Sequence, residues 1–309
     1  MKTSDIQMRD PFVFVEDGCY YLFGSTDKDI WKGAGVGFDG YRSAGGLDVL
    51  DGLDDFEGPF PAFRPPARFW SDRNFWAPEV HKYQGVYYMF ATFKPKNGRR
   101  GTAVLKSAAV AGPYEPYSAG PVTPPEWECL DGTLFVEDGV PWLVFCHEWV
   151  QTVDGEICAA RMSPDLRALA GRPVTLFHAS DAPWAAPLKS RPDKLIAPGS
   201  YVTDGPFLWK TADGGLLLLW SSFGEDGAYR IGAAKSESGL VRGPWRQSPE
   251  PLYAADGGHG MVFRALSGRL YLAIHTPNQT PLERPLFVEL AEDGGGLRVK
   301  GGSQHRKRC

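Results

Sequence analysis

The sequence DPFVFVEDGCYYLFG occupies residues 10–24, and four altered copies of it follow along the chain. Each copy opens with a polar anchor or the dipeptide WA, runs through a short apolar strand to a turn that contains glycine, and returns in a second strand. Asp-Gly between two such runs is a strong signal of a β-hairpin. The other copies are WAPEVHKYQGVYYMF at 76–90, DGTLFVEDGVPWLVF at 131–145, DGPFLWKTADGGLLLLW at 204–220 and HGMVFRALSGRLYLAI at 259–274.

The spacing of the copies predicts the architecture. They begin at residues 10, 76, 131, 204 and 259, and each interval can hold a four-stranded antiparallel sheet. We therefore expect an all-β fold, a five-bladed β-propeller in one domain over residues 1–309. A two-sheet sandwich would not explain why the polar openings recur in register. The blades are expected at roughly 8–62, 74–125, 128–180, 200–252 and 256–300.

Composition and charge restrict the class of protein. With 43% hydrophobic and 23% charged residues the chain is typical of a soluble globular protein, and 37 glycines and 26 prolines favour many tight turns. The net charge of −4 gives no support for a nucleic-acid partner, and the basic run at 305–308 is interpreted as a frayed tail. The longest apolar runs have the length of strands, so no membrane span is predicted.

The cysteines and the N-terminus bear on location. No apolar segment follows Met1, so we expect no signal peptide and a cytoplasmic protein, or a secreted one if a leader has been lost. The five cysteines, at 19, 129, 146, 158 and 309, favour free and mostly buried thiols in a reducing compartment. The sequence predicts no oligomeric state.

The first strand of each propeller blade lines the central channel, so equivalent residues of different blades meet at one mouth. We expect this geometry to gather the following anchors into one pocket: Asp10, Glu79, Asp131, Asp204 and His259. An aspartate before proline or glycine is usually a turn residue. Here separate Asp-Gly dipeptides, at 17–18, 138–139 and 213–214, already supply the turns, so the anchor carboxylates need another explanation.

These motifs resemble glycoside hydrolase family 43. The resemblance is carried, in order, by Arg9-Asp10-Pro11, by the segment 75–79, by Leu130-Asp131, by the segment 203–206 and by Gly258-His259-Gly260. It extends from about residue 9 to residue 300. It implies a five-bladed propeller that hydrolyses arabinofuranosides, xylosides or galactosides with inversion at the anomeric carbon.

The resemblance also implies roles for single residues. Asp10 corresponds to the general base, and Asp131 to the carboxylate that raises the pKa of the acid and orients it. His259 corresponds to a histidine that approaches a cation in some members. The resemblance thus makes His259 a candidate ligand for a structural calcium in the central channel, and it implies no cofactor that catalysis requires.

The fourth blade departs from the family pattern. The family commonly has glutamate as general acid where this chain has Asp204. The aspartate carboxyl ends about 1.5 Å short of where a glutamate would reach. Inversion needs a protonated carboxyl on one side of the sugar and a carboxylate on the other, so the acid could be Asp204, Glu148 or Glu79.

Further candidates concern substrate binding. Trp76 and Trp149 have flat apolar faces that can stack on a sugar ring, although packing is an equally common use of tryptophan. We include four other side chains as substrate-binding candidates: Glu79, His147, His259 and His275. The long segments 24–75 and 178–203 are expected to wall the pocket, and the first could supply an aromatic floor.

These observations predict an exo-acting inverting glycosidase that removes terminal pentose or galactose units from plant-type oligosaccharides. The alternative is a carbohydrate-binding propeller whose general acid has decayed, which the departure at Asp204 motivates. The presence of Asp10 and Asp131 argues against that alternative. A phosphorylase is disfavoured because only Arg9 supplies a basic group beside an anchor.

Overall fold

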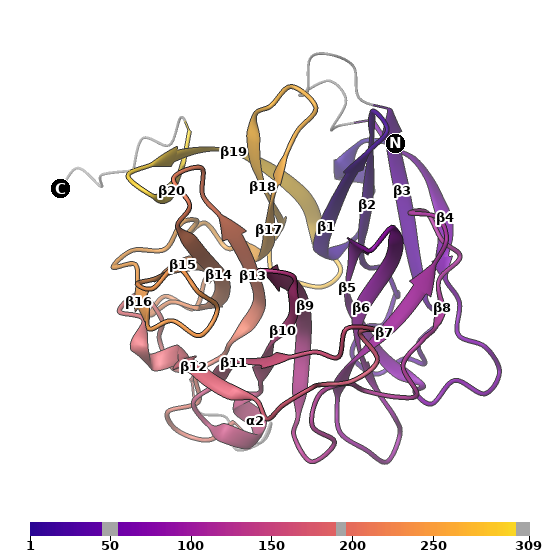
Figure 1. The fold of residues 1–309 in the computed structure, drawn as a ribbon, viewed down its shortest axis with the longest axis horizontal. Coiled ribbons are helices and arrows are strands. Elements are labelled where there is room, and N and C mark those ends of the chain that lie inside the picture. The colour runs from indigo at the N-terminus through magenta and orange to yellow at the C-terminus, as the bar shows by residue number, and fades with distance from the viewer. Residues whose placement is uncertain (45–54, 190–195, 301–309) are drawn as a thin grey trace.

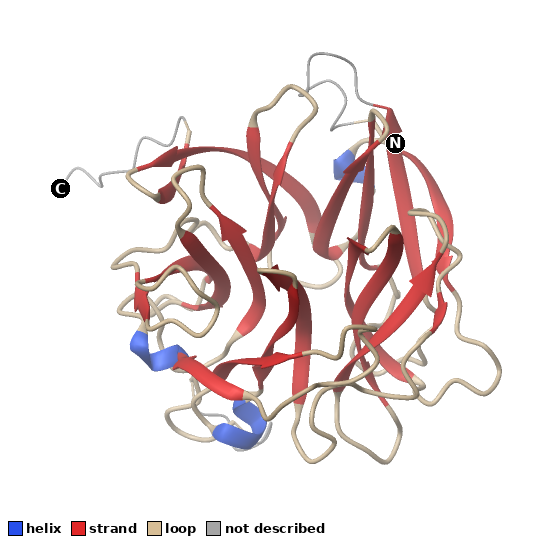
Figure 2. Cartoon of the chain, in the orientation of Figure 1, coloured by secondary structure: helices blue, strands red, loops and turns tan. Residues whose placement is uncertain are grey.

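The computed structural model describes residues 1–44, 55–189 and 196–300, and its regular structure is almost entirely β-strand (Figure 1, Figure 2). The first blade contains β1 (Arg9–Glu16), β2 (Cys19–Ser25), β3 (Phe38–Ala44) and β4 (Glu57–Phe63). The second contains β5 (Arg73–Tyr83), β6 (Val86–Lys94), β7 (Gly101–Ser107) and β8 (Glu115–Pro116). The third contains β9 (Cys129–Glu137), β10 (Val140–His147), β11 (Glu156–Arg161) and β12 (Val174–His178). The fourth contains β13 (Asp204–Lys210), β14 (Leu216–Phe223), β15 (Tyr229–Ser236) and β16 (Trp245–Gln247). The fifth contains β17 (Gly258–Arg264), β18 (Leu270–Thr276), β19 (Arg284–Asp293) and β20 (Gly296–Val299).

The five sheets are arranged around a centre. Each is a four-stranded antiparallel sheet of consecutive strands, and its first strand lies innermost. Strand β1 contacts β5 and β17, while β9 contacts β5 and β13, and β13 contacts β17, which completes the inner ring (Figure 1). The predicted five-bladed β-propeller is confirmed.

The apolar core lies between neighbouring sheets, because each sheet turns apolar side chains to both of its neighbours. Between blades 1 and 2, Phe75 and Phe93 lie with ring centroids 4.9 Å apart and at 84° to each other. Phe38 and Phe63 extend this cluster, and all four rings are fully buried. Burial of one such ring stabilises the fold by roughly 1.5–3 kcal/mol. Each blade is thus held by its neighbours.

Blades 1 and 5 share no strand, so side-chain contacts join the two ends of the ring. Arg9 Nη1 lies 2.7 Å from Glu283 Oε1, and both side chains are buried or nearly so. Arg284 Nε donates to the Ser4 carbonyl at 2.8 Å, and the Leu266 amide donates to the Tyr20 hydroxyl at 2.9 Å. The Arg9–Glu283 pair matters below because Arg9 also lies beside the candidate site.

Several sequence expectations concern features outside the blades. Within the described residues, no helix is long and apolar enough to cross a membrane. The four cysteines there, at 19, 129, 146 and 158, are free and buried, as predicted. The basic run at 305–308, Cys309 and parts of the two expected wall segments (45–54 and 190–195) lie outside the described residues.

Candidate active site

Every inner strand is interrupted by a β-bulge at the same level. The register of each inner hairpin shifts there, and one residue of each bulge has a positive φ. These residues are Asp10 (54°), Ala77 (47°), Asp131 (56°), Gly205 (47°) and His259 (47°). A bulge bends its strand and redirects the side chains beside it.

The bulges also correct the register inferred from the repeats. Asp10, Asp131 and His259 occupy equivalent places, but Ala77 and Gly205 occupy those places in blades 2 and 4. Asp204 therefore precedes its bulge residue, as Arg9 precedes Asp10. The carboxyl group of Asp204 reaches the site from a different backbone position than those of Asp10 and Asp131.

A closed ring of hydrogen bonds surrounds the site, because the amide of each bulge residue donates to a side chain of the preceding blade. The five bonds are Asp10 to His275 Nδ1 (3.2 Å), Ala77 to Ser25 Oγ (2.9 Å), Asp131 to Thr92 Oγ1 (2.8 Å), Gly205 to Asp131 Oδ2 (3.2 Å) and His259 to Ser221 Oγ (2.8 Å). Buried amides need such acceptors. The ring fixes the five bulges relative to one another.

The third blade differs within this ring. In the other blades the acceptor lies on the second strand, but the corresponding residue of blade 3, paired with Leu130, is the buried Cys146. A thiol is a weak acceptor. The Gly205 amide donates to the Asp131 carboxylate instead, which holds Oδ2 of Asp131 toward blade 4 and Asp204.

Asp10 is buried and lies among hydrogen-bond donors and basic side chains. The Ser25 hydroxyl donates to its Oδ2 at 2.5 Å, and its Oδ1 lies 3.2 Å from His259 Nδ1. Burial alone would raise the pKa of Asp10. The charges of His259 and Arg9 outweigh burial and, with the bond from Ser25, lower that pKa below its usual value. Asp10 is therefore ionised at neutral pH and can accept a proton.

Asp131 and Asp204 form a carboxyl pair with the opposite character. Burial, reinforced by the charge of Asp10, raises the pKa of Asp131 to about 7. Burial and the adjacent Asp131 raise the pKa of Asp204 well above its usual value. Two carboxyls in contact do not both ionise readily, so Asp204 keeps its proton at neutral pH. Asp10 thus supplies a carboxylate and Asp204 a carboxylic acid, and the two lie on blades that are not neighbours.

Glu148 is a fourth carboxyl at the site, located between β10 and the short helix α2 (Trp149–Thr152). Burial raises the pKa of Glu148 to about 7, although the charge of Arg100 opposes that shift. Arg100 Nη2 lies 2.6 Å from Glu148 Oε2, and the Arg100 guanidinium lies 5.2 Å from the centre of the Trp76 ring. The ion pair favours the charged form of Glu148, which makes it a weaker proton donor than Asp204.

These side chains line a cavity of about 940 Å³ that all five blades contribute to. Asp10, Asp131, Asp204, Glu148 and His259 line it together with three tryptophans, at 31, 76 and 149. The remaining lining residues are Arg9, Ile30, Arg100, Leu130, Val150, Leu188, Ile196, Val202, Thr203, Phe223, Asn278 and Thr280. The cavity therefore combines convergent carboxyls with flat and apolar surfaces, as sites for small organic ligands do.

Trp31 forms one wall of the cavity, and no sequence motif indicates it beyond its place in the expected wall segment. Its ring meets the Trp76 ring edge to face, with centroids 5.3 Å apart. Its Nε1 donates to Thr280 Oγ1 at 3.3 Å, and the Arg9 guanidinium lies 5.3 Å from the ring centre. Trp76 Nε1 donates to the Ile30 carbonyl at 2.7 Å. The segment that carries Trp31 is thereby attached to blades 2 and 5.

Three of the candidates named from the sequence do not line this cavity. Glu79 lies two residues beyond the bulge residue Ala77, deeper in the channel, and its Oε2 pairs with His81 Nε2 at 3.0 Å. His147 bonds to Glu156 at 2.9 Å and stacks on the Trp127 ring. These contacts account for Glu79 and His147 without a ligand.

His275 lies behind the cavity rather than on its wall. Burial lowers the pKa of His275 to about 4, so the imidazole is neutral at neutral pH. Its Nδ1 accepts the Asp10 amide, and its Nε2 therefore donates to Asn278 Oδ1 at 3.2 Å. His275 supports the backbone of Asp10 instead of facing a substrate.

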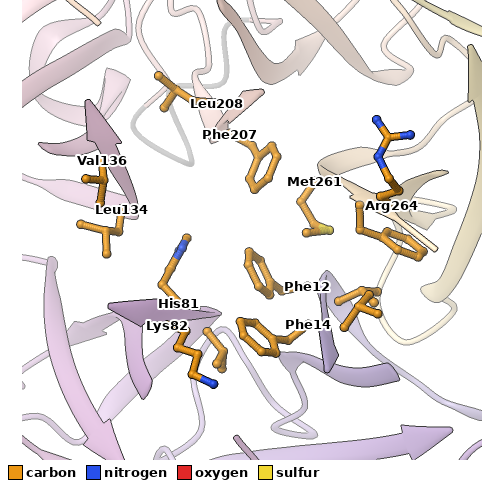
Figure 3. A pocket seen from close by; sticks show the side chains of 14 residues that line it. Phe12, Phe14, His81, Lys82, Leu134, Val136, Phe207, Leu208, Met261 and Arg264 are labelled. Carbon is orange, nitrogen blue, oxygen red and sulfur yellow. The ribbon is translucent and has the colours of Figure 1, made fainter. Parts of the chain in front are cut away.

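The channel has a different character farther along the inner strands. Residues two to five positions beyond the bulges line a second cavity of about 380 Å³, mainly with apolar side chains. Figure 3 shows Phe12, Phe207 and Met261 gathered at its centre. No group of catalytic carboxyls lines this cavity among the described residues. Among the described residues, the carboxyl groups proposed for catalysis thus line the cavity at one mouth of the channel.

The suggestion of a calcium ion can be compared with the donor atoms present. Among the described residues, Asp131, Asp204 and His259 offer donor atoms within 4.8 Å of one another. Calcium takes six to eight oxygen ligands, whereas this group offers two carboxyls and one imidazole. These side chains supply fewer oxygen ligands than calcium takes, and the mechanism proposed for this chain uses no cation.

The chain is similar to known proteins in sequence and in fold. A family model described as Glycosyl hydrolases family 43 matches residues 3–292. No curated protein sequence matches the chain. Among solved structures, an endo-arabinase from Bacteroides thetaiotaomicron is 39% identical, with a TM-score of 0.84 over 96% of this chain and 98% of that one.

Two other solved structures share the fold at lower identity. An endo-1,4-beta-xylanase from Bacteroides thetaiotaomicron is 22% identical, with a TM-score of 0.73 over 97% of this chain and 96% of that one. An alpha-L-arabinofuranosidase from Lactobacillus brevis is 16% identical, with a TM-score of 0.71 over 98% of both chains. At these identities the likeness concerns the fold alone.

Proposed function

Because the chain belongs to glycosyl hydrolase family 43 and is a glycosidase, we propose that it inverts at the anomeric carbon and releases terminal α-L-arabinofuranose from oligosaccharides. The carboxyl groups of Asp10 and Asp204 would act from opposite sides of the sugar. The observation that carries this proposal is the opposite direction of their pKa shifts within one cavity.

The proposed reaction is a single displacement. Asp10 accepts a proton from water, whose oxygen bonds to the anomeric carbon. The bond from that carbon to the leaving oxygen breaks on the other face, and Asp204 donates its proton to that oxygen. Asp131, held against Asp204 by the Gly205 amide, keeps Asp204 protonated before the reaction. A protein that only binds sugars would not need one ionised and one protonated carboxyl in the same cavity, so the non-catalytic alternative is disfavoured.

Two observations support the choice of substrate and of exo action. The solved structure at 39% identity is named an endo-arabinase, which favours an arabinose-containing substrate. The Trp31 segment, attached to blades 2 and 5, contributes one wall of the cavity, and we propose that this wall blocks the groove, open at both ends, that internal cleavage of a polymer needs. A cytoplasmic enzyme of this kind would act on short imported oligosaccharides.

The test is hydrolysis of a panel of 4-nitrophenyl glycosides and of linear arabino-oligosaccharides. We expect release from the α-L-arabinofuranoside above the xyloside and galactosides, arabinose as the sole early product, and inverted configuration by proton NMR of the first turnovers. Early products longer than one sugar would show endo action. Hydrolysis of a xyloside or galactoside alone would replace the proposed sugar, and retained configuration would contradict the mechanism.

Replacing Trp31 with alanine should open the closed side of the cavity. We expect the KM for short oligosaccharides to rise about threefold to tenfold, because a stacking surface is lost. Disaccharides should also appear among the early products, measured by chromatography. Val36→Ala, an exposed substitution in the same segment, should leave both properties unchanged. An unaltered product pattern in Trp31→Ala would contradict the role of this wall in exo action.

A further inference from the structure

Tyr229 is a buried residue that contacts the candidate acid but does not line the cavity. It begins β15, is 1% exposed, and donates its hydroxyl proton to Asp204 Oδ2 at 2.8 Å. Nothing in the sequence pattern distinguished it from the other aromatic residues of the repeats. We propose that Tyr229 is a positioning residue that fixes the orientation of the Asp204 carboxyl group, an inference that rests on the proposed function.

The ring of Tyr229 is held on several sides. It lies 5.2 Å from the Phe223 ring and nearly parallel to His275, at 5.6 Å and 21°. A Cβ atom at Gly258 would lie 2.6 Å from the ring, so this close approach requires glycine. These contacts restrict the orientation of the Tyr229 ring and so direct its hydroxyl toward Asp204 Oδ2.

The hydrogen bond determines which oxygen of Asp204 carries the proton. Tyr229 keeps its own proton, because burial, and the charge of Asp204 once that group ionises, raise the pKa of its phenol well above the usual value. Since Oδ2 of Asp204 accepts that proton, the acidic proton is favoured on Oδ1. A carboxyl one methylene shorter than the glutamate common in the family gains from such a fixed orientation, because a misplacement of about 1 Å can cost about a hundredfold in rate.

Tyr229 and His275 also link the two sides of the site. Tyr229 contacts Asp204, and its ring stacks on His275, which accepts the Asp10 amide. The two stacked rings thus lie behind both the candidate acid and the candidate base. Because His275 is neutral and Tyr229 is protonated at neutral pH, neither adds a charge that would shift the balance between Asp10 and Asp204.

The test is the Tyr229→Phe variant, which removes the hydroxyl and keeps the ring. We expect kcat to fall about tenfold to a hundredfold with little change in KM. The alkaline limb of the pH profile should move to higher pH, since the lost bond stabilised the ionised form of Asp204. The loss should be larger for substrates with a poor leaving group, which need the acid most. The control is Tyr271→Phe in blade 5, which removes a buried hydroxyl that has no hydrogen-bond partner among the described residues.

The outcomes separate this proposal from the proposed function. A loss of activity in Tyr229→Phe without a shift of the alkaline limb or a dependence on the leaving group would indicate a merely structural role and overturn the proposal. An unchanged variant would overturn it as well. Carbon-13 NMR titration of the Asp204 carboxyl, with the signal assigned through Asp204→Asn, measures the effect of the Tyr229 hydrogen bond on the pKa of Asp204 and needs no enzymatic activity. An inactive wild type would contradict the proposed function, while this titration would still test the link to Tyr229.

Discussion

Replacing Asp10 with asparagine should lower kcat at least about a thousandfold, with little change in KM. The variant keeps the shape of the side chain but cannot accept the proton of the attacking water. A thousandfold loss corresponds to about 4 kcal/mol of transition-state free energy. Asp10 is suited to this role because His259 and Arg9 keep it ionised in a buried setting. Initial rates on the arabinofuranoside measure the effect.

A second variant distinguishes loss of the base from loss of structure. In Asp10→Ala, azide can occupy the vacated space and attack without giving up a proton. We expect azide to restore part of the rate on an activated substrate and to form a glycosyl azide of inverted configuration. Asp17→Asn, in the exposed hairpin turn of the same blade, is the matched control and should remain fully active. If Asp10→Asn hydrolyses the substrate as fast as the wild type and unfolds at the same temperature, Asp10 is not the base.

The repeats made the fold predictable because the hairpin pattern is local. A polar opening, an apolar strand and an Asp-Gly turn lie within fifteen residues, as in 10–24, and five such units leave few alternatives to a propeller. The same reasoning brought Asp10, Asp131 and Asp204 together, because equivalent positions of a propeller converge. The structure places all three on one cavity.

The bulges limited what the sequence could predict about the site. A bulge shifts the register by one residue, and a shift of one residue turns a side chain to the other face of the strand. The repeat alignment could not show that Ala77, rather than Trp76 or Glu79, occupies the place of Asp10. Glu79 was therefore expected in the cavity but lies deeper in the channel.

The second limit was long-range packing. Trp31 and Tyr229 reach the site from a loop and from a third strand, where the repeat pattern carries no signal. Their positions depend on partners remote in sequence, namely Thr280 for Trp31 and Asp204 for Tyr229. The repeat pattern indicates Arg9 only as the neighbour of Asp10, although its ion pair with Glu283 joins blades 1 and 5.

Asparagine at position 204 should impair catalysis in a way that depends on the leaving group. A poor leaving group, such as the sugar hydroxyl of an oligosaccharide, needs a proton from the acid, whereas an activated phenol leaves without one. We expect Asp204→Asn to lower kcat about a thousandfold on arabino-oligosaccharides and no more than about tenfold on a 2,4-dinitrophenyl arabinofuranoside. The alkaline limb of the pH profile should also disappear, because the group that titrates there has been removed.

Glu148→Gln tests the competing assignment on the same two substrates. Glu148 is ion-paired with Arg100, which favours its charged form and weakens it as a proton donor, although burial raises its pKa to about 7. We therefore expect Glu148→Gln to weaken binding and lower the rates on both substrates by a similar factor. Asp213→Asn, in the exposed turn of blade 4, should change neither rate. If Glu148→Gln instead shows the dependence on the leaving group and Asp204→Asn does not, Glu148 is the acid. The ion pair with Arg100 would then have to break as substrate enters, because only a protonated Glu148 could serve the leaving oxygen.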